Sequence, residues 1–258
     1  MKQYLYILLS AVALGVVASS CGLDNYDGPD AQIHGKIVDK DGNLVPSDAT
    51  SSGVKIFYYE HGNYTSPTKQ SMGLKTDGTY RNNIMFSGTY DFIITDANFK
   101  QIDTVKNFKV KPGDNELNFV VEPYVTIRDF TIEQDEYNVV ARFKLSSIGG
   151  NTGKISQIQM FAYLDKVVSF GTTFALNPVP SKVLNQVPNP EKEQILRIDL
   201  TRQGDTFSKY PTDTPFCFRV GALIDASSAT AASPTAKPAP KWNYSEVKQL
   251  KLNLPPSE

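Results

Sequence analysis

The side chains best suited to acid–base catalysis are scarce in this sequence of 258 residues, which contains two histidines. Catalysis near neutral pH most often uses histidine, because its pKa lies in that range. His34 follows Ile33 inside an expected strand, and His61 precedes Gly62 in an expected turn. We interpret both histidines as ordinary strand and loop residues.

Potential metal ligands also lack a useful spacing. A zinc site takes three or four His, Cys or carboxylate ligands, and the sequence has no histidine or cysteine pair that fits. Asp39, Asp41 and Asn43 resemble the start of a calcium loop, but the positions of the required glycine and glutamate hold Leu44 and Thr50. We therefore expect a hairpin turn here, with no metal site and no cofactor.

Nucleophilic chemistry has one candidate, Cys217. It alternates with Phe216 and Phe218 in an expected strand, so it would face away from them, on the side of Arg219. One arginine is weak support for a reactive thiolate. The carboxylates at 135–136 lie in a loop-like, solvated setting. We predict a protein that is not an enzyme, and keep as a minor hypothesis a hydrolase that uses a carboxylate pair formed between domains.

Aromatic rings beside expected loops offer a different chemistry. The C–H groups of a sugar pack on a ring face, while neighbouring polar groups bind its hydroxyls. The only tryptophan, Trp242, follows a long irregular segment and is the strongest single candidate. Core packing is the competing interpretation of every one of these rings. The predicted ligand-binding residues are Trp242, Tyr244, Tyr59 and Tyr64, with Phe170 and Phe174 as further candidates.

The first residues have the features of an export signal. Lys2 precedes an apolar run at 5–18, which is shorter than the roughly 20 residues of a membrane-spanning helix. The small residues Ser19 and Ser20 before Cys21 resemble the lipobox of bacterial lipoproteins. That resemblance implies a signal peptide at 1–20 and a diacylglycerol on Cys21, with acylation of the new amino terminus. The alternative is ordinary cleavage nearby, with Cys21 left free.

Residues 21–30 are acidic and rich in turn formers, so we expect a flexible tether. Lipid chains alone can hold a protein on a bilayer when there are two or more. In lipoproteins of Bacteroidetes, acidic residues after the lipidated cysteine resemble a signal for the outer face of the outer membrane. Asp24 is consistent with that signal. We expect a lipid-anchored outer-membrane protein that faces the cell exterior.

The charge balance argues against nucleic acid as a partner. The chain has 26 basic and 27 acidic residues, and the basic ones are scattered rather than clustered. Asp103-Thr104-Val105 resembles the short O-glycosylation acceptor of exported Bacteroidetes proteins, which makes Thr104 a candidate modification site.

Short strands separated by turn residues predict an all-β fold of two tandem β-sandwich domains. The first would span 31–123 and the second 124–258, because Pro123 cannot donate to a sheet ladder. A turn is expected at 112–115, and long irregular segments at 169–191 and 225–241. Strands are expected at 33–38, 54–59, 80–85, 88–94, 104–110, 117–121, 137–145, 155–164, 195–200, 216–224 and 247–254.

Two domain resemblances accompany this pattern. The run IHGKIVDKDGN, with VKIFYYE, LKTDGTYR and SGTYDFIIT after it, resembles a carboxypeptidase regulatory-like or transthyretin-like sandwich. The second half resembles a fibronectin type III or immunoglobulin-like domain.

Together with the lipobox and the closing WNYSEVKQLKL, these features resemble a family of two-domain Bacteroidetes lipoproteins found beside Sus-type nutrient importers. The resemblance implies an accessory protein whose partners are the transporter, its substrate-binding lipoprotein and a polysaccharide or oligosaccharide. The alternative is a structural or assembly subunit of an importer, including one for peptides, with no soluble ligand of its own.

Overall fold

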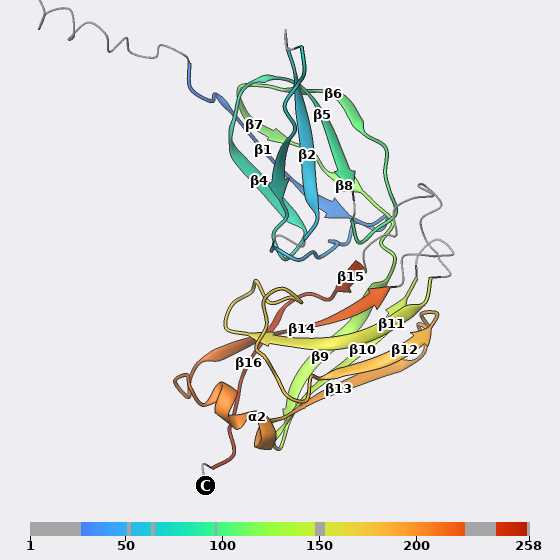
Figure 1. Ribbon diagram of the computed structural model, residues 1–258, viewed down its shortest axis with the longest axis vertical. Coiled ribbons are helices and arrows are strands. Elements are labelled where there is room, and N and C mark those ends of the chain that lie inside the picture. The colour runs from blue at the N-terminus through green and yellow to red at the C-terminus, as the bar shows by residue number, and fades with distance from the viewer. Residues whose placement is uncertain are drawn as a thin grey trace, which may run out of the picture.

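The computed structural model describes residues 27–50, 53–62, 65–95, 97–147, 153–224 and 241–256. These residues form two β-sandwiches placed end to end (Figure 1). Nearly all of the regular structure is strand, so the predicted all-β class is confirmed. Cys21, Tyr64 and all of the expected segment 225–241 except Lys241 lie outside the described residues.

The first sandwich contains two sheets. One has the strand order β4-β1-β7, with β8 also paired to β1, and the other has the order β3-β2-β5-β6. The strands are β1 (Ala31–Val38), β2 (Lys55–His61), β3 (Gln70–Gly73), β4 (Thr79–Met85), β5 (Gly88–Thr95), β6 (Val105–Val110), β7 (Gly113–Glu116) and β8 (Phe119–Val120).

Alternation along β5 shows why this segment is a strand. Tyr90, Phe92 and Ile94 are buried in the first core, and the residues between them are partly exposed. Successive side chains of a strand point to opposite faces, so these three fill one face of the sheet. The rings of Tyr58 and Tyr90 lie 6.1 Å apart, and those of Tyr58 and Phe92 lie 5.9 Å apart. The first core is therefore strongly aromatic.

The expected turn at 112–115 is wrong in part. Gly113, at φ +85°, turns the chain, but it also begins β7, which runs parallel to β1. β7 lies at the end of its sheet and its residues are mostly exposed. An exposed edge strand needs no buried face, so its sequence carries no apolar alternation.

The second sandwich pairs a sheet of order β13-β10-β9 with one of order β12-β11-β14-β15, in which β16 also pairs with β14. Long β14 holds both short strands, β15 near its end and β16 near its start. The strands are β9 (Thr126–Asp135), β10 (Asn138–Ser146), β11 (Ile155–Tyr163), β12 (Ser181–Gln186), β13 (Glu193–Asp199), β14 (Pro215–Ile224), β15 (Lys241–Tyr244) and β16 (Lys248–Lys251).

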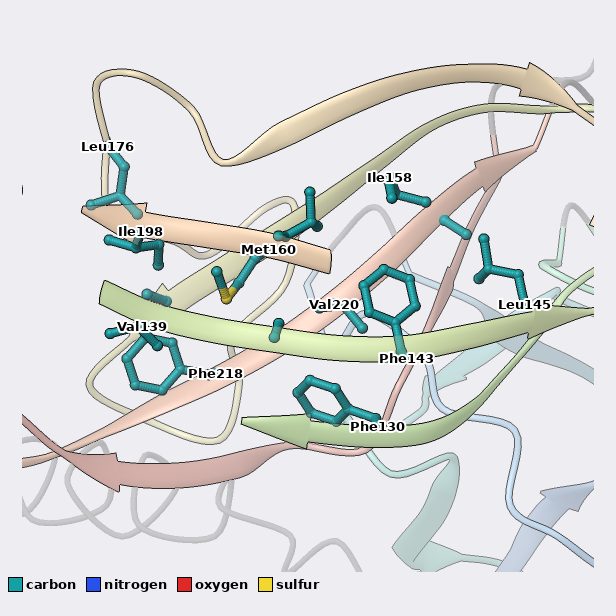
Figure 2. Packing of buried hydrophobic residues seen from close by; sticks show 14 of the residues in the cluster. Phe130, Val139, Phe143, Leu145, Ile158, Met160, Leu176, Ile198, Phe218 and Val220 are labelled. Carbon is teal, nitrogen blue, oxygen red and sulfur yellow. The ribbon is translucent and has the colours of Figure 1, made fainter. Parts of the chain in front are cut away.

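The core of the second sandwich lies between its two sheets. Phe143 and Leu145 of β10, Ile158 and Met160 of β11, and Phe218 of β14 all contribute to it. Figure 2 shows these side chains, from both sheets, filling the interior. Their alternation with outward-facing residues is the pattern that predicted these strands.

One helix in the described part of the chain, α2 (Leu200–Phe207), was not predicted. Asp199 caps it by accepting from the backbone N–H of Thr201 over 2.9 Å. Its eight residues bury Leu200 and Phe207 against the second core. Two turns with Gly204 inside give too short an apolar period to recognise. No helix among the described residues is long and apolar enough to cross a membrane.

The expected irregular segment 169–191 is also wrong in part, because it contains β12. β12 is an end strand of its sheet and pairs with β11 alone. Its side chains are largely exposed, so, like β7, it lacks the pattern of a half-buried strand.

Candidate functional site

The two sandwiches are joined by Arg219, a side chain of β14 that points away from the second core. The guanidinium is fully buried and donates to four backbone carbonyls. Two of them belong to the first sandwich, Ser47 O at 2.9 Å and Thr76 O at 3.0 Å. The other two are Ser245 O at 2.9 Å and Val168 O at 3.2 Å. Arg219 therefore holds the two sandwiches against each other.

The charge of Arg219 survives its burial. Loss of hydration lowers the pKa of the guanidinium to about 9, with smaller opposing effects from Tyr244 and Asp48, so it stays protonated at neutral pH. The carbon of the guanidinium lies 4.1 Å from the centre of the Tyr244 ring, a cation–π contact. The four carbonyls and the ring replace the water that the cation loses.

Strand β15 adds two further links across the junction. Asn243 donates from Nδ2 to Asn98 O of the first sandwich over 2.6 Å. The Tyr244 hydroxyl donates to Asp48 Oδ2 over 3.4 Å and accepts from the backbone N–H of Phe170 over 3.3 Å. Burial raises the pKa of this hydroxyl above its ordinary value. The junction is thus built by β14, β15 and the loop before β12.

An aromatic group lies beside this junction, outside the second core. We call Phe161, Phe170, Trp242 and Tyr244 the junction aromatic group. The rings of Phe170 and Trp242 lie 5.5 Å apart with 23° between their planes, and those of Trp242 and Tyr244 lie 6.4 Å apart at 25°. The Phe161 ring meets Trp242 edge to face at 5.4 Å. The structure therefore brings the predicted residues Trp242 and Phe170 together.

Gly221 of β14 makes room for this group. A Cβ there would come within 2.9 Å of a ring carbon of Phe161 and of one of Trp242, closer than such atoms normally approach. Glycine is therefore the residue that lets both rings lie on the sheet. Phe170 remains 55% exposed and Trp242 is half-buried, so the surface of the group consists of these two rings.

The other predicted site residues are placed differently. Tyr244 is 6% exposed, so its ring belongs to the junction rather than to the surface. Tyr59 lies half-buried on β2 opposite Asp91, toward the end of the strand that is remote from the junction. Phe174 packs against the second core, and Thr104 is half-buried immediately before β6.

A cleft of about 910 Å³ runs between the two sandwiches. It was not predicted, because its walls come from segments far apart in the sequence. Tyr244 both lines the cleft and stacks with Trp242, so the cleft and the junction aromatic group adjoin. The lining residues come from 39–46, 75–77, 123–130, Lys166 and 243–247.

The acid and base candidates of the sequence have ordinary partners. His34 Nε2 lies 3.0 Å from Asp114 Oδ2, and His61 Nε2 lies 3.1 Å from Asp91 Oδ1, both near the surface. No group of three or more His, Cys, Asp or Glu side chains that could hold a metal occurs among the described residues. Burial raises the pKa of the Cys217 thiol, which disfavours the nucleophilic thiolate.

The expected hairpin at Asp39 is confirmed. The Asp39 carboxylate accepts from the backbone N–H groups of Asp41 and Asn43, both at 2.9 Å, and from the Asn43 amide. Burial opposes its ionisation, but the hydrogen bonds from Asn43 and Asp41 lower its pKa overall. This hairpin forms part of the cleft wall.

Comparison with known proteins gives a family. Residues 31–122, the first sandwich, match the model described as Protein of unknown function (DUF3823) N-terminal domain. A solved structure of a proposed carbohydrate binding protein from Bacteroides uniformis is 34% identical, with 87% of this chain and 100% of that chain covered and a TM-score of 0.75. No curated protein matches this chain.

Two DUF3823 family structures share the fold at lower identity. The protein from Parabacteroides merdae is 19% identical with a TM-score of 0.66, over 87% of this chain and 100% of that chain. The protein from Bacteroides ovatus is 17% identical with a TM-score of 0.63, over 86% and 100%. Residues 31–122 of the chain thus form a DUF3823 N-terminal domain, and the chain shares its fold with DUF3823 family proteins.

Proposed function

We propose that this protein is a non-enzymatic, lipid-anchored accessory component of a Sus-type uptake system at the outer membrane, and that it binds a glycan at the junction of its two sandwiches. The observation that carries the glycan part is the pair of surface rings, Phe170 and Trp242, held nearly parallel 5.5 Å apart. The free face of an exposed ring in such a stack can receive the C–H face of a sugar.

The two rings are supported by neighbouring groups of the protein. Trp242 is supported by Phe161 beneath it, and the backbone of Phe170 is fixed by the Tyr244 hydroxyl. A ligand that binds ordered side chains loses less conformational entropy to them, so more of the contact energy is retained as affinity. The 34% identical relative from Bacteroides uniformis, itself proposed to bind carbohydrate, supports the same ligand class.

The location within the cell rests on the sequence alone. A lipid on Cys21 would attach the chain to the outer membrane through the tether at 21–30, close to the transporter and its substrate-binding lipoprotein. Mass spectrometry of the native protein tests this step. We expect a diacylglycerol thioether at Cys21 and loss of membrane association in Cys21→Ala, whereas an unacylated amino terminus in the native material would remove the anchor.

The glycan part is tested by titration calorimetry of the full chain in detergent against a panel of polysaccharides and oligosaccharides. We expect Phe170→Ala and Trp242→Ala each to weaken binding at least about tenfold, which is about 1.4 kcal/mol. Phe86→Ala is the matched control, because Phe86 is 48% exposed on the first sandwich, away from the junction. Binding that survives in both junction variants, or no binding to any panel member, would remove the glycan assignment.

A second function is favoured by the outer edge of β12. Val179, Val183 and Val187 lie along and beside this end strand and are 52%, 69% and 45% exposed. An open strand edge with apolar side chains can add a strand from another protein. A structural subunit of an importer would use this edge. Pull-down from solubilised membranes should then recover importer proteins with the wild type and fewer with Val183→Lys, while recovery of this lipoprotein alone argues against the subunit role.

A further inference from the structure

The charged side chains that line the cleft fall into two sets, the acids, which have partners within the protein, and the bases, which form no ion pair. All four lining carboxylates have partners of their own. Asp39 is held by the Asn43 hairpin, and Asp77 accepts from Thr79 N at 2.9 Å and Thr79 Oγ1 at 2.7 Å. Asp129 pairs with Lys144 at 3.4 Å, and Glu246 pairs with Lys248 at 3.1 Å. The ion pairs balance the charges of Asp129 and Glu246, whereas the hydrogen bonds orient Asp39 and Asp77 and leave their negative charges in place.

The three positively charged side chains that line the cleft differ from these acids. Lys75, Arg128 and Lys166 are exposed, and none forms an ion pair with an acidic side chain in the part of the chain that the structure describes. Lys75 comes from the β3–β4 turn, Arg128 from β9 and Lys166 from the loop after β11, so both sandwiches contribute. A concave wall concentrates the field of such charges. The cleft lining therefore presents three cations without an ion-pair partner, against two carboxylates, Asp39 and Asp77, whose negative charges are not balanced by an ion pair.

The cleft wall also contains uncommitted hydrogen-bonding atoms. Asn243 is 2% exposed, and its Oδ1 has no hydrogen-bond partner among the described residues; the same holds for the buried Oγ1 of Thr126. Buried polar atoms are normally paired, so these two unpaired atoms mark polar positions just behind the surface of the cleft wall. An amide oxygen accepts, so it suits a hydroxyl donor.

We infer that the interdomain cleft binds an acidic saccharide, with Lys75, Arg128 and Lys166 contacting its carboxylate or sulfate groups and the polar wall meeting its hydroxyls. This inference rests on the proposed glycan-binding function and adds the ligand class to it. Uronic acids and sulfated sugars present the same combination of anionic groups and hydroxyls. An acidic peptide lacks the dense hydroxyls, so the saccharide is favoured.

The test is calorimetry of the full chain in detergent with five probes: oligogalacturonate, a chondroitin sulfate oligosaccharide, a neutral malto-oligosaccharide, a neutral xylo-oligosaccharide and poly-glutamate. The variant is the triple substitution Lys75→Gln, Arg128→Gln and Lys166→Gln. Its matched control is Lys182→Gln, Arg197→Gln and Lys209→Gln, which removes the same charge from exposed positions outside the cleft. Circular dichroism checks that both variants are folded.

We expect at least one acidic saccharide to bind, with affinity that falls as salt is raised. The cleft variant should bind it more than tenfold more weakly and the control within twofold of wild type. Binding of only one acidic probe identifies the acid group that the cleft prefers, and supports the inference.

Four outcomes would overturn it. An equal loss of affinity in the cleft variant and in the control would show that binding depends on the net charge of the protein and not on these three positions. Binding of neutral oligosaccharides only, still sensitive to Trp242→Ala, would leave the proposed function intact and remove the acidic ligand class. Binding of poly-glutamate as strong as that of the saccharides would assign the cleft to acidic peptides. Binding of none of the probes would remove the acidic ligand class, while the glycan assignment is decided by the wider panel described above.

Discussion

Both sandwiches have aromatic rings in their cores, but the second also has a separate aromatic group outside its core. In the first, Tyr58, Tyr90 and Phe92 stand in the core and pack against one another. In the second, Trp242 and Tyr244 lie on the outer face of a sheet, separate from the main core. Rings in a core contribute mainly to folding, whereas rings outside it can form a junction and a surface. Stability and binding measurements should therefore separate the two groups.

The largest effect is expected for Phe92→Ala in the first core. The side chain is fully buried, so its removal leaves a cavity and costs about 3–5 kcal/mol of unfolding free energy. Urea denaturation measures the loss. A loss below about 1 kcal/mol would contradict the assignment of Phe92 to a tightly packed core.

Arg219→Met should have the next largest effect, because it removes a donor from carbonyls of both sandwiches. A buried unsatisfied acceptor costs about 1–3 kcal/mol, and carbonyls that keep another donor, as Thr76 O keeps the Ser47 N–H, or that gain water cost less, so we expect a loss of about 2–4 kcal/mol in total. The substitution should weaken the contact between the two sandwiches. We therefore expect the sandwiches of the variant to unfold in separate steps and small-angle scattering to show a longer particle. Arg197→Met, an exposed arginine of β13, is the control and should change neither measurement.

Gly221→Ala tests whether the junction aromatic group is seated on the sheet. The new methyl would press on Phe161 and Trp242, at an expected cost of about 1–3 kcal/mol. Because Trp242 is the only tryptophan, its fluorescence reports the displacement directly. Gly73→Ala, where a Cβ meets nothing within 4 Å, should leave the spectrum unchanged.

Asp39→Asn tests the contribution of the cleft hairpin through its pH dependence. The folded pKa of Asp39 is lowered, so its carboxylate stabilises the fold above the ordinary carboxyl pKa of about 3.9, and that contribution is lost as pH falls through the folded pKa. We expect the variant to be less stable by about 1 kcal/mol at pH 6. Thermal melts should show this difference shrinking below pH 4, and a constant difference from pH 6 to pH 2.5 would refute it.

The smallest stability effect is expected for Phe170→Ala, which gives the sharpest contrast with Phe92. The ring is more than half exposed, so its loss should cost less than about 1 kcal/mol. Its predicted effect is on ligand affinity. A loss of stability as large as that of Phe92→Ala would place Phe170 among the folding residues and leave the surface pair without a separate role.

The strands with one buried face were predictable because alternation marks them, as Val139 to Leu145 of β10 shows. β3, β7, β9 and β12 were missed because these end strands, with few buried side chains, have no such alternation. The pairing of β15 with β14 was also missed, since residues that precede Lys241 were read as one long loop.

For the site, ring type and loop position pointed to Trp242 and Phe170, and the structure places these two together. The role of Arg219 could not be inferred, because its partners are backbone carbonyls 143 and 172 residues away. A carbonyl has no residue-type signature, so such a contact leaves no pattern in the sequence. The cleft was hidden for the related reason that both sandwiches form it.

The point where the chain enters the first sandwich has a consequence for orientation. Asp30 is fixed by Ser87, through the backbone N–H at 2.6 Å and the hydroxyl at 2.7 Å, at the end of β1 opposite the junction. Eight residues of strand span about 26 Å. With a lipid on Cys21, the first sandwich would act as a spacer above the bilayer. A polymer could then reach Trp242 without approaching the lipid headgroups.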